Sequence, residues 1–393
     1  MHHSPRRRCR RFLLRGRRAA RATRAARLPL AIAFLLLSAC GGRGSEVIET
    51  RTFVEEQRIG SLHDPASALT DVHGLAVSDD GELFVAQPQE GVVKVIDVTS
   101  GTIVRTIGRA GSGPGEFIGV GVLGLQGDTL WALDNAGALN YFTAAGEHLR
   151  TVRLPPLRTE AVSVPGSGIP TPEGRHLAVA HGSSGERDVP ILVRCADGTV
   201  CDTAVVRRTE RKGQARIDTG RGIAMVLLPF RDGAVMGIQP ETAELALAVA
   251  SKQYHTISLV RVTSTGDTIL NTTLPYEPIP ISPAHLDSIM ARNPLLEQQN
   301  AEYRRGFREA LERFTHFPPV TRVYPAADGV TWLRRERTGA DSATWTSVRP
   351  DGSVWFDARL PSEADIRWAS GEIIWAVIPD ELDVPFLVRL RAR

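Results

Sequence analysis

The chain has 393 residues, which is enough for one large core or for two or three ordinary domains. Its formal net charge of +3 hides an uneven distribution, because residues 1–39 hold eleven arginines and no acidic residue. From Cys40 onward, 36 of the 47 Lys and Arg residues remain against 44 Asp and Glu residues, a net charge of −8. This acidic balance argues against a basic surface for nucleic acid, so no nucleic-acid partner is expected.

The first 39 residues have the pattern of an export signal. A basic segment over 6–27 precedes an apolar segment over 28–37, which is too short to span a bilayer comfortably. Leu37, two small residues and Cys40 follow in that order. The order resembles the bacterial lipobox, in which the cysteine is lipidated and becomes N-terminal after cleavage. We therefore predict a lipoprotein signal peptide over 1–39, and the alternative is an ordinary signal peptide with an incidental cysteine.

The lipobox predicts a protein of the bacterial cell envelope, attached to the membrane through lipidated Cys40. Gly41 follows the cysteine where an aspartate would favour retention at the inner membrane, so the resemblance favours the outer membrane. Residues 40–45 form a short tether, and one folded region is expected over 46–393.

Two further cysteines, Cys195 and Cys201, flank an Asp197-Gly198 turn. The turn predicts a β-hairpin in which the two cysteines face each other, and an exported compartment permits a disulfide. Free thiols are the alternative. The local sequence has no further ligands for a zinc site.

The folded region is built from repeated β units. The first unit, over 72–107, contains four short apolar strands separated by turns, and the second, over 121–154, repeats that order. The glycine-rich segment 105–117 joins these two units, since four glycines and a proline within nine residues do not fit inside a strand or helix. Weaker units follow over 176–207, 222–274, 320–360 and 366–390.

Repeats of this length with four strands each are typical of β-propeller blades. We therefore predict an all-β fold, a six-bladed β-propeller with four-stranded antiparallel blades. The sixth unit lacks one strand, and an unassigned strand at 49–59 begins the folded region. Pairing the two would let the N-terminal strand close the last blade and remove two sheet edges. Two separate all-β domains are the alternative.

A long insertion over 282–317 interrupts the repeats between the fourth and fifth units. Ser282-Pro283 and Asn293-Pro294 are helix-start signals, which predict helices over 284–292 and 295–315. This helical insertion, at about 283–315, serves either as a packing brace or as a lid over the central channel. Apolar residues fall on one stripe of the second helix: Leu296, Tyr303, Phe307, Leu311 and Phe314.

Parts of the repeats resemble known propeller families. The segment 108–117 resembles the inter-blade loop of NHL-repeat propellers, and 74–86 with 133–146 resemble the two halves of such a repeat. Segments 274–282 and 380–384 are similar to six-bladed, TolB-like bacterial lipoproteins. The resemblance implies the propeller fold and little about function.

Five polar residues are candidates for lining the channel, because they begin or end strands near its axis. In that position they would contact a ligand or hold a metal. The alternative is that each satisfies a turn or a strand end. The eight histidines after Cys40 are scattered without metal-ligand spacing, so no metal, no cofactor and no catalytic residue is predicted. The five candidates are His73, Asp134, Asn135, His176 and His181.

The sequence therefore leaves two main functions open, and a third, an assembly partner of envelope machinery, rests on the analogy with TolB-like folds alone. The first is a lipid-anchored binding or scaffold propeller that presents its channel face to a peptide, a glycan or a partner protein. The alternative is a metal-dependent lactonase- or lyase-like enzyme with its site in the central channel.

Overall fold

The computed structural model describes the segment Ile48–Arg393. Within it, the described residues exclude 62, 159–161, 165–167, 180, 183–186, 196–198, 210–212, 221, 231–232, 252 and 336–340. The predicted signal peptide, Cys40 and the tether lie outside the described residues. No helix among the described residues is long and apolar enough to cross a membrane.

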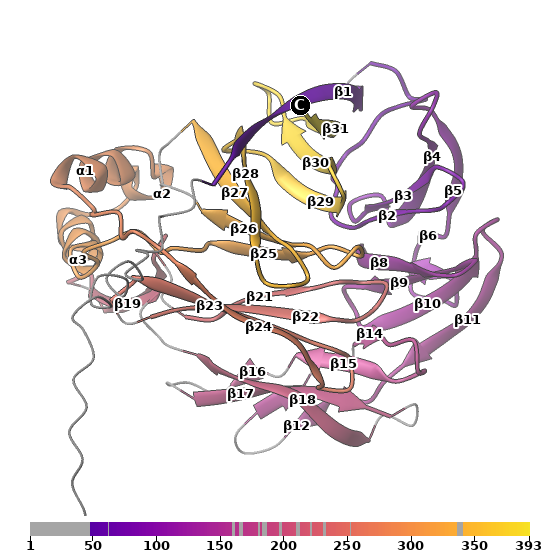
Figure 1. Ribbon diagram of the computed structural model, residues 1–393, viewed down its shortest axis with the longest axis horizontal. Helices are drawn as coiled ribbons and strands as arrows, with labels where there is room; N and C mark the ends of the chain where they lie inside the picture. Colours follow the sequence, from indigo (N-terminus) through magenta and orange to yellow (C-terminus); the bar gives the residue numbers. More distant parts are fainter. Residues whose placement is uncertain are drawn as a thin grey trace, which may run out of the picture. The chain divides into compact units, whose positions relative to one another are not determined.

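The fold is all-β and propeller-like, and most of it consists of antiparallel sheets whose strands follow one another in the chain (Figure 1). In the described part of the chain, four separate sheets have four strands each. The first contains β2 (Leu75–Val77), β3 (Glu82–Gln87), β4 (Val92–Asp97) and β5 (Ile103–Ile107). The second contains β8 (Val120–Gln126), β9 (Thr129–Asp134), β10 (Ala138–Thr143) and β11 (His148–Arg153). The third contains β14 (Ile169–Pro170), β15 (His176–Val179), β17 (Arg187–Arg194) and β18 (Val200–Thr209). The fourth contains β21 (Val235–Ile238), β22 (Leu245–Ala250), β23 (Thr256–Val262) and β24 (Thr268–Pro275).

The remaining large sheet has eight strands in the order β25-β26-β27-β28-β1-β31-β30-β29. Its first group contains β25 (Arg322–Pro325), β26 (Thr331–Arg335), β27 (Ser342–Val348) and β28 (Val354–Pro361). Its second group contains β1 (Thr50–Ile59), β31 (Pro385–Ala392), β30 (Ile373–Pro379) and β29 (Asp365–Ser370).

Strand β1 joins these two groups. Its pairing with β31 is antiparallel, from Phe53 opposite Ala392 to Ile59 opposite Leu387, so the predicted pairing of the N-terminal strand with the last strand is confirmed. The sequence did not predict that the strand also pairs in parallel with β28, from Thr50 to Thr52. Because β31 ends at Ala392, the first residues of β1 extend past it and pair with the neighbouring strand, β28.

Hydrophobic clusters fill the spaces between neighbouring sheets. Phe84 of the first sheet shares a cluster with Phe142 of the second, and Leu177 of the third shares one with Leu245 of the fourth. Trp332 and Ile374 meet in the same way between the two halves of the large sheet. Alternating apolar residues therefore bury their side chains against the next sheet.

The glycine-rich segment is confirmed as the connection between the first and second sheets. It contains two short parallel strands, β6 (Arg109–Ala110) and β7 (Glu116–Phe117). The Glu116 carboxylate accepts the Gly113 N–H at 2.8 Å and pairs with Arg109, which closes the loop on itself. Gly108 has φ +74°, and a Cβ at this position would clash with the Phe117 ring.

Two predicted strands of the later repeats are assigned differently by the structure. His176 was expected on the innermost strand of the third unit, but β14 precedes it, because a turn at Thr171–Gly174 forms an additional hairpin. His181 lies in β16 (His181–Gly182), in a separate small sheet with β12 (Leu157–Arg158) and β13 (Val162–Val164).

The second correction concerns 222–229, which was expected to form a strand of the fourth unit. It forms β20 (Ile223–Leu227), which pairs with β19 (Gln214–Asp218) in a hairpin outside the large sheets. The physical reason is that Val226 packs with the helical insertion, together with Ile217 of β19.

The insertion contains three helices where two were predicted: α1 (Pro283–Ala291), α2 (Pro294–Glu297) and α3 (Ala301–Leu311). Both predicted caps are confirmed, because Ser282 accepts the His285 N–H at 3.3 Å and Asn293 accepts the Leu295 N–H at 3.1 Å. A third cap, Asn300, accepts the Tyr303 N–H at 2.8 Å and begins α3, which divides the predicted second helix.

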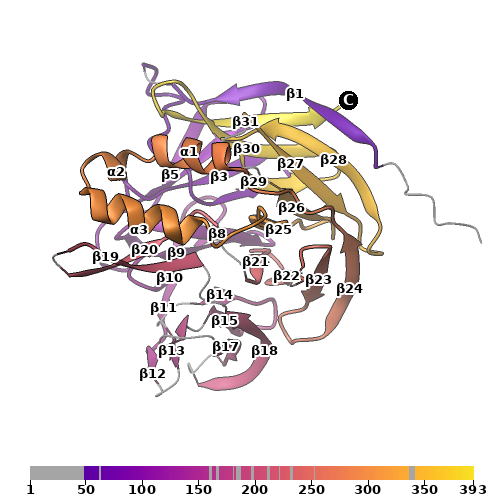
Figure 2. The same cartoon turned by 90° about the vertical axis from the view of Figure 1, so that its left-hand side faces the viewer.

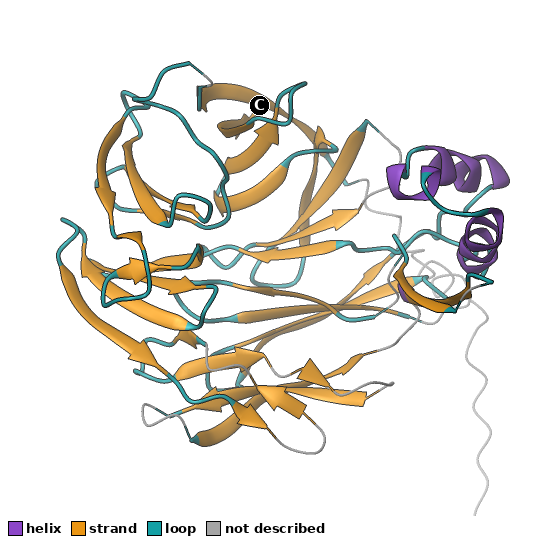
Figure 3. Cartoon of the chain, turned by 180° about the vertical axis from the view of Figure 1, so that it is seen from behind, coloured by secondary structure: helices purple, strands orange, loops and turns teal. Residues whose placement is uncertain are grey.

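The apolar stripe of the insertion packs against the β19–β20 hairpin. Phe307, Leu311 and Phe314 share a cluster with Ile217 and Phe230. Figure 3 shows the helices beside the short hairpin. Helices and hairpin therefore brace each other.

Candidate functional site

Charged residues from three chain segments gather where innermost strands meet. They come from β25, from β29 and from the segment before β2. The Tyr324 hydroxyl of β25 donates to the Arg367 carbonyl of β29 at 3.1 Å, which ties the two strands together. We call Asp71, His73, Arg322, Asp365 and Arg367 the inner-strand charge cluster.

Asp365 is the centre of this cluster. Its carboxylate forms an ion pair with Arg322 through one oxygen and with Arg367 Nη2, at 2.9 Å, through the other. The Asp365 side chain is only 19% exposed, so the pair with Arg367 is largely shielded from solvent. Two guanidinium groups share this carboxylate, and the Asp71 carboxylate acts on Arg367 as well, so two arginines are balanced by two aspartates.

Arg367 also has an unused hydrogen-bond donor. Its Nε is buried and has no hydrogen-bond partner among the described residues. Burial lowers the pKa of the Arg367 guanidinium, and the carboxylate of Asp71 acts in the opposite direction. The charge of Asp71, in the segment before β2, therefore acts on Arg367 in the large sheet.

Asp71 and His73 form the outer part of the cluster. His73 Nε2 lies 3.3 Å from Asp71 Oδ2, and the His73 side chain is 54% exposed. An imidazole in this position can donate a hydrogen bond to a ligand or accept one. The cluster thus runs from a shielded ion pair to an accessible histidine.

A second polar group lies around Tyr324. Burial raises the pKa of the Tyr324 hydroxyl, and the charge of Glu241 adds to the rise. Burial also raises the pKa of the Glu241 carboxyl, and the charge of Asp79 raises it further. A hydrogen bond that Gln239 donates to Glu241 at 2.7 Å opposes this rise. Since Glu241 and Asp79 each follow an innermost strand, this group also draws on separate sheets.

The other predicted channel residues do not join His73. Asp134 is buried, and its Oδ1 accepts the Ala138 N–H at 2.6 Å, which stabilises a turn. The N–H of Asn135 donates to the Gly119 carbonyl at 2.8 Å. His176 is buried beside Arg194, and burial, followed by the charge of Arg194, lowers its pKa. The side chain of His181 lies outside the described residues.

The described residues do not bring metal ligands together, since no three His, Cys, Asp or Glu side chains among them form a group able to hold an ion. Cys195 follows β17, and its N–H donates to the Thr199 carbonyl at 2.9 Å. The side chain of Cys201, in β18, lies outside the described residues, so the disulfide stays a prediction.

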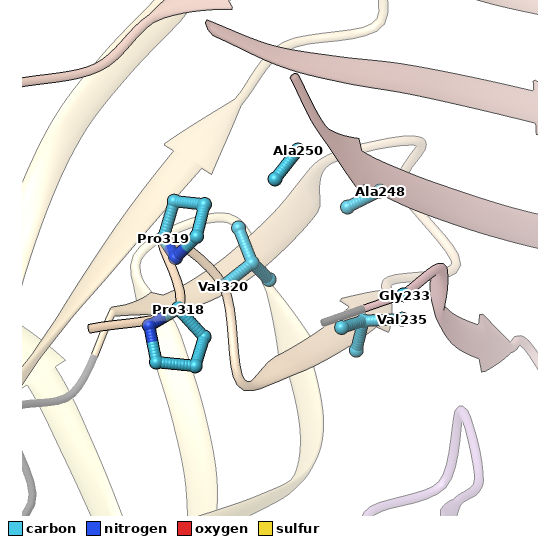
Figure 4. Close-up of a pocket in the computed structure, with 7 residues that line it drawn as sticks. All are labelled: Gly233, Val235, Ala248, Ala250, Pro318, Pro319 and Val320. Carbon is cyan, nitrogen blue, oxygen red and sulfur yellow. The ribbon is translucent and has the colours of Figure 1, made fainter. Parts of the chain in front are cut away.

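A shallow hollow between the fourth sheet and the segment after the helices is lined by residues without polar side chains (Figure 4). It offers no group for catalysis and no charge for recognition. Its lining residues are Gly233, Val235, Ala248, Ala250, Pro318, Pro319 and Val320.

Sequence reasoning found His73 and missed Asp71, Arg322, Asp365 and Arg367. A signal was present, because Arg322 and Asp365 are the first residues of β25 and β29, and Asp71 also precedes an innermost strand. Charged residues at equivalent starts of several repeats indicate a shared position near the axis.

Fold and cluster together define an all-β, propeller-like protein with a mixed-charge cluster between innermost strands. No protein-family model matches the chain, and no curated protein matches it.

Several solved structures are similar at low identity. An exported protein from Bacteroides fragilis is 12% identical, with a TM-score of 0.47, over 87% of this chain and 95% of that chain. The PQQ-bound aldose sugar dehydrogenase from Streptomyces coelicolor is 11% identical, with a TM-score of 0.40, over 87% and 98%. Streptogramin B lyase is 14% identical, with a TM-score of 0.39, over 87% and 98%. These likenesses are too distant to indicate a ligand or an activity.

Proposed function

We propose that the protein is a lipid-anchored envelope β-propeller that binds a partner through its channel face. The observation that carries the proposal is the sharing of the Asp365 carboxylate by Arg322 and Arg367. Guanidinium groups bind carboxylates through paired hydrogen bonds, and the side chains of Arg322 and Arg367 are 44% and 26% exposed, so a ligand can reach them. The ligand is therefore a peptide, a glycan or a partner protein that presents a carboxylate.

The proposal includes six blades, with the eight-stranded sheet counted as two. Two observations support this count. Each half of that sheet has four strands, and the halves are joined by the short parallel pairing of Thr50 to Thr52 with β28. A hydrophobic cluster also separates the halves, as clusters separate the other sheets. An NHL-repeat or TolB-like relationship remains part of the proposal and rests on the sequence patterns.

The envelope location rests on the order of basic segment, apolar segment, small residues and Cys40. Attachment to the outer membrane and the Cys195–Cys201 disulfide belong to the same proposal. An oxidising compartment outside the cytoplasm would permit that bond.

Binding is tested by the ligand-induced shift of the thermal unfolding midpoint. The probes are hexaglutamate and an oligogalacturonate, with hexaglutamine and a galactose oligosaccharide as neutral controls. We expect at least one acidic probe to raise the midpoint of the wild-type protein, because a ligand that binds only the folded state stabilises it. Neutral probes should leave the midpoint unchanged.

The matched variants are Arg367→Met and Arg308→Met, each compared with its own unliganded midpoint. Arg308 lies on the surface of α3 and pairs with Asp287, away from the inner-strand charge cluster. Arg367→Met should lose the shift and Arg308→Met should keep it. Equal shifts in both variants, or no shift with either acidic probe, would contradict the proposal.

The enzyme alternative is a metal-dependent lactonase- or lyase-like activity. No observation among the described residues favours it, because they contain no group of three metal-ligating side chains. Metal analysis of the purified protein tests it directly: bound calcium or zinc at one ion per chain would favour the enzyme.

A further inference from the structure

The β19–β20 hairpin has one buried face and one exposed face. Ala215 and Ile217 pack into the cluster with α3. On the other face, the side chains of Ile223, Met225 and Leu227 are 55%, 64% and 62% exposed. Figure 2 shows the hairpin beside α3, and its two strands form a sheet of their own.

The same three residues direct their backbone groups away from the hairpin. The Thr219 N–H donates to the Gly222 carbonyl, and the Leu228 N–H donates to the Gly213 carbonyl, each at 2.9 Å. Bonded pairs alternate along an antiparallel ladder, so Ala224 and Val226 face β19 with their backbone groups. The N–H and C=O groups of Ile223, Met225 and Leu227 therefore point to the outer edge. Among the described strands, β20 pairs only with β19.

Within the described hairpin, this edge lacks three of the usual protections against strand pairing. Natural sheets guard their edges with charged residues, prolines or bulges. The segment 222–228 contains no charged residue and no proline, and the β19–β20 register has no shift. An apolar edge with unused backbone groups is a template for another strand.

We propose that a second copy of this chain pairs with β20, edge to edge and antiparallel, about a two-fold axis at Met225. Met225 then lies opposite Met225 of the partner subunit, and Ile223 lies opposite the partner's Leu227. All the outward backbone groups of these residues find partners, and the apolar side chains form continuous cross-strand contacts. The exposed charges of the hairpin, on Arg216 and Asp218, lie on β19, one strand away from the seam, which is the line where the two β20 strands pair.

The size of the seam sets its strength. Stable interfaces bury about 800 Å² per partner, and a single short strand buries far less. The dimer is therefore weak and reversible, with a dissociation constant on the order of micromolar or higher.

Register-specific disulfide formation tests the two-fold axis. Cα atoms of a directly bonded pair lie about 5.5 Å apart, which is within disulfide range. We expect Met225→Cys to form a covalent dimer on mild oxidation, in intact cells and in the purified full chain. The double variant Ile223→Cys/Leu227→Cys should do the same. Ile223→Cys alone should stay at the wild-type level, because the two copies of this residue lie about 14 Å apart.

Sedimentation of the full-length protein in density-matched detergent provides an independent measurement. We expect the wild-type mass to rise with concentration over about a hundredfold range. Met225→Glu places two carboxylates at the axis and should weaken association at least about tenfold. The control Leu382→Glu, at a side chain 75% exposed in another loop, should behave as wild type. Circular dichroism verifies that both variants fold.

The proposal is overturned if the wild-type protein stays monomeric over the whole concentration range. It is also overturned if Met225→Cys and Ile223→Cys form covalent dimers equally, since random collision would then explain both.

Discussion

Replacing Asp365 by asparagine should destabilise the protein, because it removes the carboxylate that Arg322 and Arg367 share. Breaking a buried ion pair by removing one partner costs about 3–5 kcal/mol. Here Asp365 is 19% exposed and Arg322 is 44% exposed, so solvent replaces part of the loss. We therefore expect a decrease of about 2 kcal/mol in the free energy of unfolding, equivalent to a midpoint lowered by about 3 °C.

Urea unfolding measures this change, with Asp287→Asn as the matched control. Asp287 also pairs with an arginine, Arg308, but its side chain is 64% exposed. The control should lose less than about 0.5 kcal/mol. In the double variant Asp365→Asn/Arg367→Met, the loss should be smaller than the sum of the single losses, because the unpaired charge is gone. A change within about 0.5 kcal/mol for Asp365→Asn, or strict additivity, would refute the reasoning.

Three further predictions concern other parts of the chain. In urea unfolding, Gly108→Ala should lower the free energy of unfolding more than Gly81→Ala does. Both glycines have positive φ, but only at Gly108 would a Cβ clash with a neighbour, the Phe117 ring. Equal losses of unfolding free energy would contradict this packing argument. Cys40→Ser should move the protein from the membrane to the soluble fraction, as seen by immunoblotting of both fractions, and persistent membrane binding would show the lipobox interpretation to be wrong. Burial lowers the pKa of His176, so the contribution of this residue to stability is complete above about pH 6.5 and is lost as the pH falls below that value. The difference in unfolding free energy between wild type and His176→Asn should therefore shrink between pH 7 and 5, and parallel curves of unfolding free energy against pH would exclude the effect.

The sequence alone predicted the features that depend on neighbouring residues. Alternating apolar residues and turn glycines located the strands of the first two sheets, and Ser282 and Asn293 marked two helix starts. Local signals also misled: 222–229 has a strand pattern, and it forms a strand, but in a hairpin that packs on α3 and not in a large sheet. A local pattern specifies an extended backbone and leaves the choice of partner open.

Tertiary structure decided which distant residues meet. The inner-strand charge cluster joins Asp71 to Asp365 and Arg367, nearly 300 positions later in the chain, because their strands come together where the innermost strands meet. The parallel pairing of β1 with β28 also depends on how far the N-terminal strand extends past the end of β31. Periodicity reports only which side of a strand is apolar, whereas these contacts depend on the order and spacing of whole sheets.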